Sequence, residues 1–348
     1  MKPLPFNKWP LADRTMWDRL VAHADFLDEP GPGAHWKPVT RMDLIIGYGH
    51  WLAYLIHDGL DLESEAPTAR LTPSRVARYI RSLTQVAYST RAARIRTLSV
   101  LMPRSDPSSD WEWLLKMRRP LDACERRYRG AKKRQRMVAS HLLLEAGLGL
   151  MARAKHQTKW SARKRAIVFR DGLAIALLAS RPLRRKNFAG LRLGHHMQVA
   201  PFGYRIDIPA EETKTGVPIE TVLPDTLLPW FKEYLEVHRP VLLGGKLSDY
   251  VWIMYRGRPY SPKHLGERIT ALTEKLVGKR VNPHLFRDCA ATTIATVDPE
   301  HVRMIASLLG HSTPDTAERY YNQARSMEAG RAHQDNMLLL RARQRAKG

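Results

Sequence analysis

Cysteine is scarce in this 348-residue sequence, and its two cysteines, Cys124 and Cys289, lie far apart in the chain. Disulfide frameworks and Cys-based zinc sites need several cysteines at short, regular spacings. The sequence therefore argues against both kinds of structure. We expect a protein of a reducing cytoplasm.

Long apolar runs are also missing. The longest, GLAIALLAS at 172–180, is far shorter than the ~18 residues of a membrane span. The opening MKPLPFNKWPLADR contains no apolar core of signal-peptide length. We expect neither export nor membrane insertion. A Gly-x-x-x-x-Gly-Lys-Ser/Thr loop is absent too, which argues against a P-loop ATPase.

Acidic residues are few compared with basic ones. Lys and Arg number 57 against 34 Asp and Glu, which gives a formal net charge of +23. Such a surface attracts nucleic acid, an anionic membrane or an acidic partner, whereas any single charged run is ordinarily a solvated face. Because the excess is spread over the whole chain, we expect a nucleic-acid partner.

The chain is too long for one typical domain of roughly 100–150 residues, so two domains are expected. Residues 1–125 contain short helical patterns between loops. In TPSRVARYIRSL, Thr72 is placed to cap a helix, Pro73 suits its first position, and apolar residues recur at i, i+3, i+4 and i+7 from Val76. These features predict a helical first domain.

A strongly basic stretch, residues 126–137, follows and has almost no apolar residues. We predict that it links the two domains, either as a solvated flexible joint or as a strap along DNA, where its cations would replace counterions on phosphates. Charge alone does not decide between the two. The candidate DNA-binding residues are Arg126, Arg127, Arg129, Lys132, Lys133, Arg134 and Arg136.

Apolar helical patterns return in residues 138–330, the predicted second domain. Between 197 and 223 they give way to the extended runs YRIDIP and VPIETVLP, separated by AEETKTG, which predict a β-hairpin or meander. We therefore expect a mostly α chain with a small antiparallel β-sheet, the second domain being α+β. Residues 331–348 form a basic tail that includes three leucines.

Three motifs near the end of this domain stand in a distinctive order. HLFR places His284 and Arg287 on one face of a helix, which by itself is common on protein surfaces. LLGHSTPDTAERYY then places His311 in a Leu-Gly-His turn and Tyr320 nine residues later. Together they resemble the signature of the tyrosine recombinase, or phage integrase, family.

The resemblance implies two further site residues. Family members carry an earlier arginine in a turn after an apolar helix, and the register of ASRPLRRKNFAGLRL matches it to Arg184, with Arg181 and Arg185 as close alternatives. Asn187 stands where many members have an acidic residue. Members also place a lysine in a turn of the small sheet, and Lys214 is the match.

By resemblance, the chain is expected to be a site-specific recombinase or integrase, serving a mobile element, that cleaves and rejoins duplex DNA through a 3′-phosphotyrosine. The nine-residue spacing favours Tyr320 over Tyr321 as nucleophile. Lys214 is expected to act as general acid and His284 as general base, with His311 on the scissile phosphate. The full set of expected catalytic residues is Arg184, Lys214, His284, Arg287, His311 and Tyr320.

The resemblance also implies partners. The first domain is expected to clamp duplex DNA, and a homotetramer is expected to assemble on two sites, alone or with other recombinases or DNA-bending factors. The tail at 331–348 either passes to a neighbouring protomer or packs on its own chain. A nucleoid-associated, cytoplasmic location follows.

Other interpretations are a catalytically silent DNA-binding protein of the same fold, a type IB topoisomerase, and a basic RNA-binding protein. No cofactor and no metal are expected, since protein cations can stabilise the phosphate. The adjacent pair His195 and His196 is not expected to bind metal, because neighbouring side chains point apart on a helix or strand.

Overall fold

The computed structural model describes most of the chain, namely residues 1–24, 29–201, 203–297, 301, 329, 333–334 and 336–338. The chain divides into two compact units, Met1–Arg134 and Gln135–Gly348. The division falls within the predicted basic linker.

The N-terminal unit is built from helices, and no strand occurs among its described residues. They are α1 (Leu11–Val21), α2 (Pro38–His57), α3 (Pro73–Ser82), α4 (Tyr88–Ser105) and most of α5 (Glu112–Arg136). Helix α3 matches the prediction: the Thr72 side chain accepts a 3.3 Å hydrogen bond from the Arg75 amide, and Val76 and Tyr79 are buried. The periodic stripe therefore faces the core, as expected for an amphipathic helix.

A buried ion pair lies inside this core. Both side chains of Asp13 and Arg70 are buried, and Arg70 Nη1 donates to both Asp13 carboxylate oxygens at 2.9 Å. Tyr48 adds a 2.7 Å hydrogen bond to Asp13, and burial, with the Asp13 charge, raises the pKa of Tyr48. Buried charges persist only when paired in this way, so the network joins α1, α2 and the loop before α3.

The predicted linker forms the end of a helix. Helix α5 continues to Arg136, because neither Pro nor a Gly cluster interrupts residues 126–136. Most of the predicted DNA-binding side chains are exposed, while Arg136 is half-buried and donates from Nε to the carbonyl oxygen of Arg280 at 2.7 Å. Arg136 thus has a structural contact within the second unit.

The second unit surrounds the apolar helix α7 with shorter helices and a sheet. Its helices are α6 (Ser140–His156), α7 (Ala162–Ser180), α8 (Arg185–Ala189), α9 (Leu228–Glu233), α10 (Arg239–Leu243), α11 (Pro262–Val277) and α12 (Pro283–Val297). Helices α6 and α7 approach closely at Gly147 and Gly172, where a Cβ on Gly147 would lie 2.7 Å from the Gly172 oxygen. Only glycine allows this approach.

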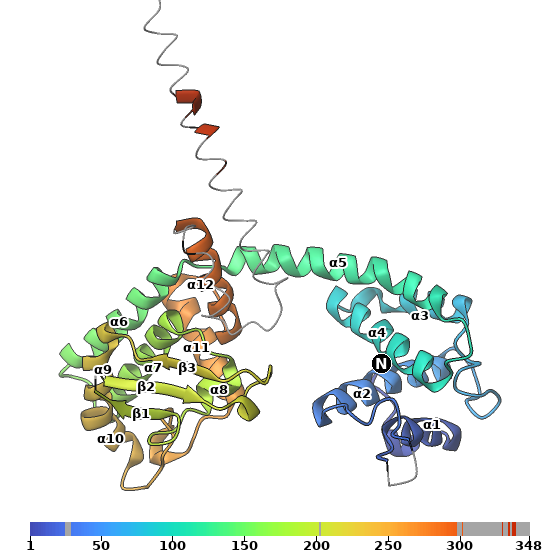
Figure 1. Cartoon of the computed structure of the whole chain (residues 1–348), viewed down its shortest axis with the longest axis horizontal. Helices are drawn as coiled ribbons and strands as arrows, with labels where there is room; N and C mark the ends of the chain where they lie inside the picture. Colours follow the sequence, from blue (N-terminus) through green and yellow to red (C-terminus); the bar gives the residue numbers. More distant parts are fainter. Residues whose placement is uncertain are drawn as a thin grey trace, which may run out of the picture. The chain divides into compact units, whose positions relative to one another are not determined.

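The sheet is an antiparallel meander in the order β1-β2-β3 (Figure 1). Its strands are β1 (Met197–Ala200), β2 (Gly203–Ile208) and β3 (Ile219–Val222). In register, Ile206 pairs with Met197 on one side and with Thr221 on the other. The prediction of a mostly α fold with a small antiparallel sheet is confirmed, and the alternation in YRIDIP gives buried Ile206 and Ile208.

No helix in the described part of the chain is both long and apolar enough to cross a lipid bilayer.

Candidate active site

Arg184 lies in the short connection between α7 and α8. It occupies the N-cap position of α8, with extended backbone at φ −63° and ψ 141°. Its Nη1 lies 3.4 Å from the Thr215 hydroxyl. Partial burial lowers the pKa of the Arg184 guanidinium from its ordinary value, although arginine stays charged at neutral pH.

Thr215, which Arg184 contacts, directly follows the predicted lysine in the chain. Lys214, Thr215 and Gly216 lie in the long connection between β2 and β3, and Gly216 has a φ of +68° that favours glycine. Lys214 itself is exposed. The lysine therefore stands in a turn of the sheet, beside the residue that Arg184 contacts.

Helix α12 supplies the HLFR motif. Asn282 caps the helix by accepting a 2.9 Å hydrogen bond from the Leu285 amide. His284 is exposed in the first turn, whereas Arg287, one turn later, is only 6% exposed. The Arg287 Nη1 donates a 2.7 Å hydrogen bond to the carbonyl oxygen of Pro182. Arg287 is thus fixed to the same connection that carries Arg184.

The two alternative arginines have other contacts. Arg181 donates from Nε to the Thr221 hydroxyl at 3.0 Å and to the Val222 oxygen at 3.1 Å, both on β3. Arg185 packs against α11, where a Cβ on Gly266 would lie 3.0 Å from its Cδ. Of the contacts described for the three arginines, the one that Arg184 makes with Thr215 reaches the turn that carries Lys214.

Asn187 has a role that the sequence did not reveal. It is 8% exposed, and its Nδ2 donates a 3.1 Å hydrogen bond to the carbonyl oxygen of Glu212. A carboxylate at this position could not donate that bond. The Asn187 side chain, in place of an acidic one, therefore makes a contact that holds α8 to the segment just before Lys214.

The prediction that the side chains of His195 and His196 point apart is wrong. The two rings lie with centroids 4.3 Å apart and face one carboxylate: His195 Nε2 is 3.4 Å from Glu212 Oε1, and His196 Nε2 is 3.1 Å from Glu212 Oε2. The pair lies in a turn next to Gly194 at φ +76°, not on a helix or strand. Partial burial raises the pKa of Glu212, but the hydrogen bonds from the two histidines outweigh it and lower the pKa below the usual value.

His311, Tyr320 and Tyr321 lie outside the described residues, as does most of the tail at 331–348. Of the six predicted catalytic residues, the structure therefore describes Arg184, Lys214, His284 and Arg287.

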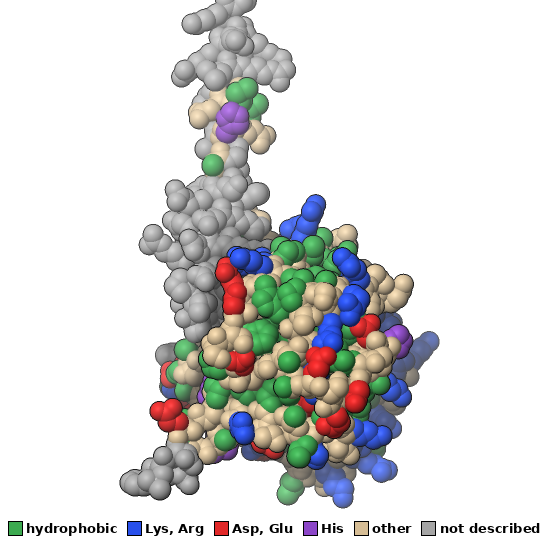
Figure 2. Space-filling view, turned by 90° about the vertical axis from the view of Figure 1, so that its right-hand side faces the viewer, with side chains coloured by type: hydrophobic (Ala, Val, Ile, Leu, Met, Phe, Trp, Pro, Cys, Tyr) green, Lys and Arg blue, Asp and Glu red, His purple; other side chains and the backbone are tan. Residues whose placement is uncertain are grey.

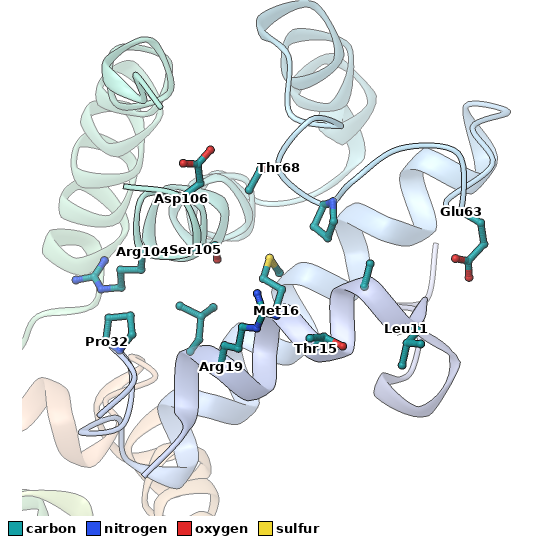
Figure 3. A pocket seen from close by; sticks show the side chains of 13 residues that line it. Leu11, Thr15, Met16, Arg19, Pro32, Glu63, Thr68, Arg104, Ser105 and Asp106 are labelled. Carbon is teal, nitrogen blue, oxygen red and sulfur yellow. The ribbon is translucent and has the colours of Figure 1, made fainter. Parts of the chain in front are cut away.

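A separate cavity of about 650 Å³ lies in the N-terminal unit. Figure 3 shows Met16 and Arg19 of α1 beside it, with Arg104 and Asp106 from the end of α4. Arg184, Lys214, His284 and Arg287, the predicted catalytic residues that the structure describes, do not line it.

On the face drawn in Figure 2, Lys and Arg side chains lie at many places, with fewer Asp and Glu among them. This distribution fits the net charge of +23 and would favour a polyanionic partner.

The family model for the phage integrase family matches residues 150–327, more than half of the chain. The chain therefore belongs to the phage integrase family.

Among curated relatives, the tyrosine recombinase XerD of Proteus mirabilis is 30% identical over 97 residues, 27% of this chain and 31% of the relative. XerD of Pseudomonas aeruginosa is 30% identical over 105 residues, 30% of this chain and 35% of the relative. The chain thus matches about a third of the length of these relatives.

Two solved structures share the fold. The XerH site-specific recombinase bound to a palindromic difH substrate, a post-cleavage complex, has a TM-score of 0.59 and 14% identity, covering 84% of this chain and 79% of that one. A lambda integrase (75–356) dimer bound to a COC′ core site has a TM-score of 0.54 and 15% identity, covering 83% and 90%. At these identities the likeness shows the fold alone.

Proposed function

We propose that this chain is a site-specific DNA recombinase that cleaves and rejoins duplex DNA through a 3′-phosphotyrosine on Tyr320. The observation that carries the proposal is a pair of contacts: Arg287 to Pro182 at 2.7 Å, and Arg184 to Thr215 at 3.4 Å. They link α12, the Arg184 connection and the Lys214 turn. Family membership and DNA-bound structural neighbours support the same function.

The reaction conserves the energy of the phosphodiester bond. The Tyr320 oxygen attacks phosphorus and forms a P–O bond, while the bond to the 5′ oxygen breaks and that oxygen leaves as a hydroxyl. An incoming 5′-hydroxyl reverses the step and releases the tyrosine. No energy-supplying cofactor is needed, because the ester formed has an energy similar to that of the ester broken.

Arg184 and Arg287 have the chemistry to stabilise the transition state. Negative charge develops on the non-bridging phosphate oxygens, and planar guanidinium groups bind such oxygens with paired hydrogen bonds. Arg287 is held rigidly by burial and by Pro182. Donors that are already oriented lower the barrier more than mobile ones.

Two proton transfers complete each step. We propose that His284 accepts the proton from Tyr320 as general base; His284 is exposed on the same helix as Arg287. Lys214, exposed in its turn, would protonate the leaving 5′ oxygen. His311 would donate a hydrogen bond to the phosphate.

The proposal extends to the assembly. The N-terminal unit would clamp the duplex and the basic residues of α5 would contact phosphates, while four copies, alone or with other recombinases or DNA-bending factors, would join two sites of a mobile element. The tail at 331–348 would either pass to a neighbouring protomer or pack in cis. A nucleoid-associated location would follow.

Covalent trapping tests the proposal against a silent architectural protein. Wild type, Tyr320→Phe and the control Tyr321→Phe would be incubated with nicked duplexes from the DNA flanking the gene, then denatured. Adducts with wild type and Tyr321→Phe, but not with Tyr320→Phe, are expected. Tight duplex binding without any adduct would favour the silent protein, and relaxation of supercoiled DNA at random sites would favour a type IB topoisomerase.

A further inference from the structure

The connection that carries Lys214 is long. It runs between the end of β2 at Ile208 and the start of β3 at Ile219, and connections of this length between antiparallel strands need anchors to hold one conformation. Several anchors meet at Glu212, two residues before Lys214. Two peptide steps place the two Cα atoms at most about 7 Å apart.

Glu212 is held through both its backbone and its side chain. Asn187 donates to its carbonyl oxygen at 3.1 Å, and His195 and His196 face its two carboxylate oxygens. Asn187 and His196 are 8% and 4% exposed, so these two contacts come from buried side chains with little freedom. The next residue, Thr213, is buried and closes a turn through its amide on Ala210 at 3.1 Å.

The tautomer of His196 is set by the backbone. Its Nδ1 accepts a 3.2 Å hydrogen bond from the Arg192 amide, so Nδ1 carries no proton. In the neutral ring the proton is then on Nε2, which donates it to Glu212. The ring is therefore oriented as a fixed donor to the carboxylate.

The same tautomer argues against a metal ion between these three residues, although their ligand atoms lie within 4.8 Å of one another. A histidine that binds metal through Nε2 needs a proton on Nδ1 and ordinarily donates it to an acceptor. Here Nδ1 faces the Arg192 N–H, which is a donor. With a metal on Nε2, the proton on His196 Nδ1 would face the Arg192 N–H, and two hydrogen-bond donors would repel each other.

We propose that Glu212 is a positioning residue for Lys214: His195, His196 and Asn187 hold Glu212, and Glu212 fixes the turn from which Lys214 protonates the leaving oxygen. This inference rests on the proposed function, because it assigns a step of that reaction. It adds a second group of residues, outside the expected catalytic set, on which catalysis depends.

A sulfur-containing substrate separates positioning from general structural damage. In a duplex whose scissile 5′ oxygen is replaced by sulfur, Tyr320 forms the P–O bond and the P–S bond breaks, leaving a thiolate. Because a thiol has a pKa near 8.5, the thiolate leaves without a proton from Lys214. Defects in proton donation should therefore disappear on the sulfur substrate, whereas defects in phosphate binding should persist.

The variants are Glu212→Gln, the matched control Glu211→Gln on the neighbouring exposed carboxylate, and Lys214→Ala as reference. We expect Glu212→Gln to cleave the oxygen substrate roughly 10- to 100-fold more slowly, as for a misplaced catalytic group. Its rate on the sulfur substrate should return close to that of wild type, as for Lys214→Ala. Glu211→Gln should match wild type on both.

Two results would overturn the inference alone: wild-type cleavage of the oxygen substrate by Glu212→Gln, or an equal defect on both substrates. Failure of wild type to cleave either substrate would contradict the proposed function as well.

Hydrogen exchange of the Thr213 amide tests the inference without DNA, and the exchange should be faster in Glu212→Gln than in Glu211→Gln. One equivalent of Zn²⁺ bound by wild type and lost in His195→Ala would contradict the assignment of the His196 tautomer.

Discussion

The Arg287 guanidinium donates a 2.7 Å hydrogen bond to the carbonyl oxygen of Pro182, a residue 105 positions earlier in the chain. Pro182 lies in the stretch ASRPLRRKNFAGLRL, where no role was predicted for it, yet its carbonyl oxygen holds the buried arginine of HLFR beside the connection that carries Arg184. The predicted phosphate-binding groups therefore depend on main-chain geometry as well as on their own side chains.

Arg184→Lys should lower the rate of covalent adduct formation by about 10²–10³-fold, because lysine keeps the charge but loses the planar donor pair. The matched control is Arg185→Lys, since Arg185 is exposed and packs its aliphatic part on α11. Single-turnover cleavage with saturating protein measures both. Equal losses in the two variants would contradict the assignment of Arg184.

Asn187→Asp restores the acidic residue type found in many family members, and here it should destabilise the second unit. The Glu212 carbonyl would lose its 3.1 Å donor and face a buried carboxyl group, which costs about 1–3 kcal/mol for an unsatisfied group. Calorimetric unfolding of the full chain checks this. Unchanged melting of the second unit would show that the Asn187 bond contributes nothing.

Local patterns predicted several features correctly because short-range physics determines them. Thr72 and Pro73 begin α3, and the alternation in YRIDIP gives a strand with a buried face. In contrast, the contact between Arg287 and Pro182 depends on long-range packing. No pattern within a single segment contains that information.

The pair His195 and His196 shows why local rules fail at turns. The rule that neighbours point apart holds for helices and strands, but a turn with a left-handed glycine, Gly194, brings both rings to one side. Residues 126–136 are helical, since a high charge density does not prevent a helix when the residues have good helical propensity. The contact between Asn187 and the Glu212 carbonyl joins two segments that are 25 positions apart, so no local pattern predicted it.

The exposed basic residues of α5 should contribute to DNA affinity through charge. The triple variant Arg126→Gln, Arg127→Gln and Arg134→Gln removes exposed cations from the helix. The slope of log Kobs against log salt concentration should become shallower by roughly 0.9 for each phosphate that the variant no longer neutralises. Fluorescence anisotropy over a salt series measures the slope, with circular dichroism to verify helix content. An unchanged slope would assign α5 to a purely structural role.

His238 should make the second unit sensitive to acid. It is 7% exposed and stacks on Phe169 with ring centroids 4.0 Å apart; burial lowers its pKa from the usual 6.5, partly offset by Glu233. The unfolded state therefore takes up a proton more readily, and stability falls as pH drops from 6.5 toward the folded pKa. His238→Phe, which keeps an aromatic ring, should lose less stability between these limits. Identical melting profiles against pH would contradict this expectation.

Peptide mapping of the trapped covalent complex would identify the nucleophile itself. Wild-type protein would be captured on the sulfur-containing duplex, digested with nuclease and protease, and sequenced by tandem mass spectrometry. We predict a nucleotide linked through its 3′-phosphate to Tyr320. Attachment at Tyr321 or at any other side chain, or through a 5′-phosphate, would refute the proposed reaction.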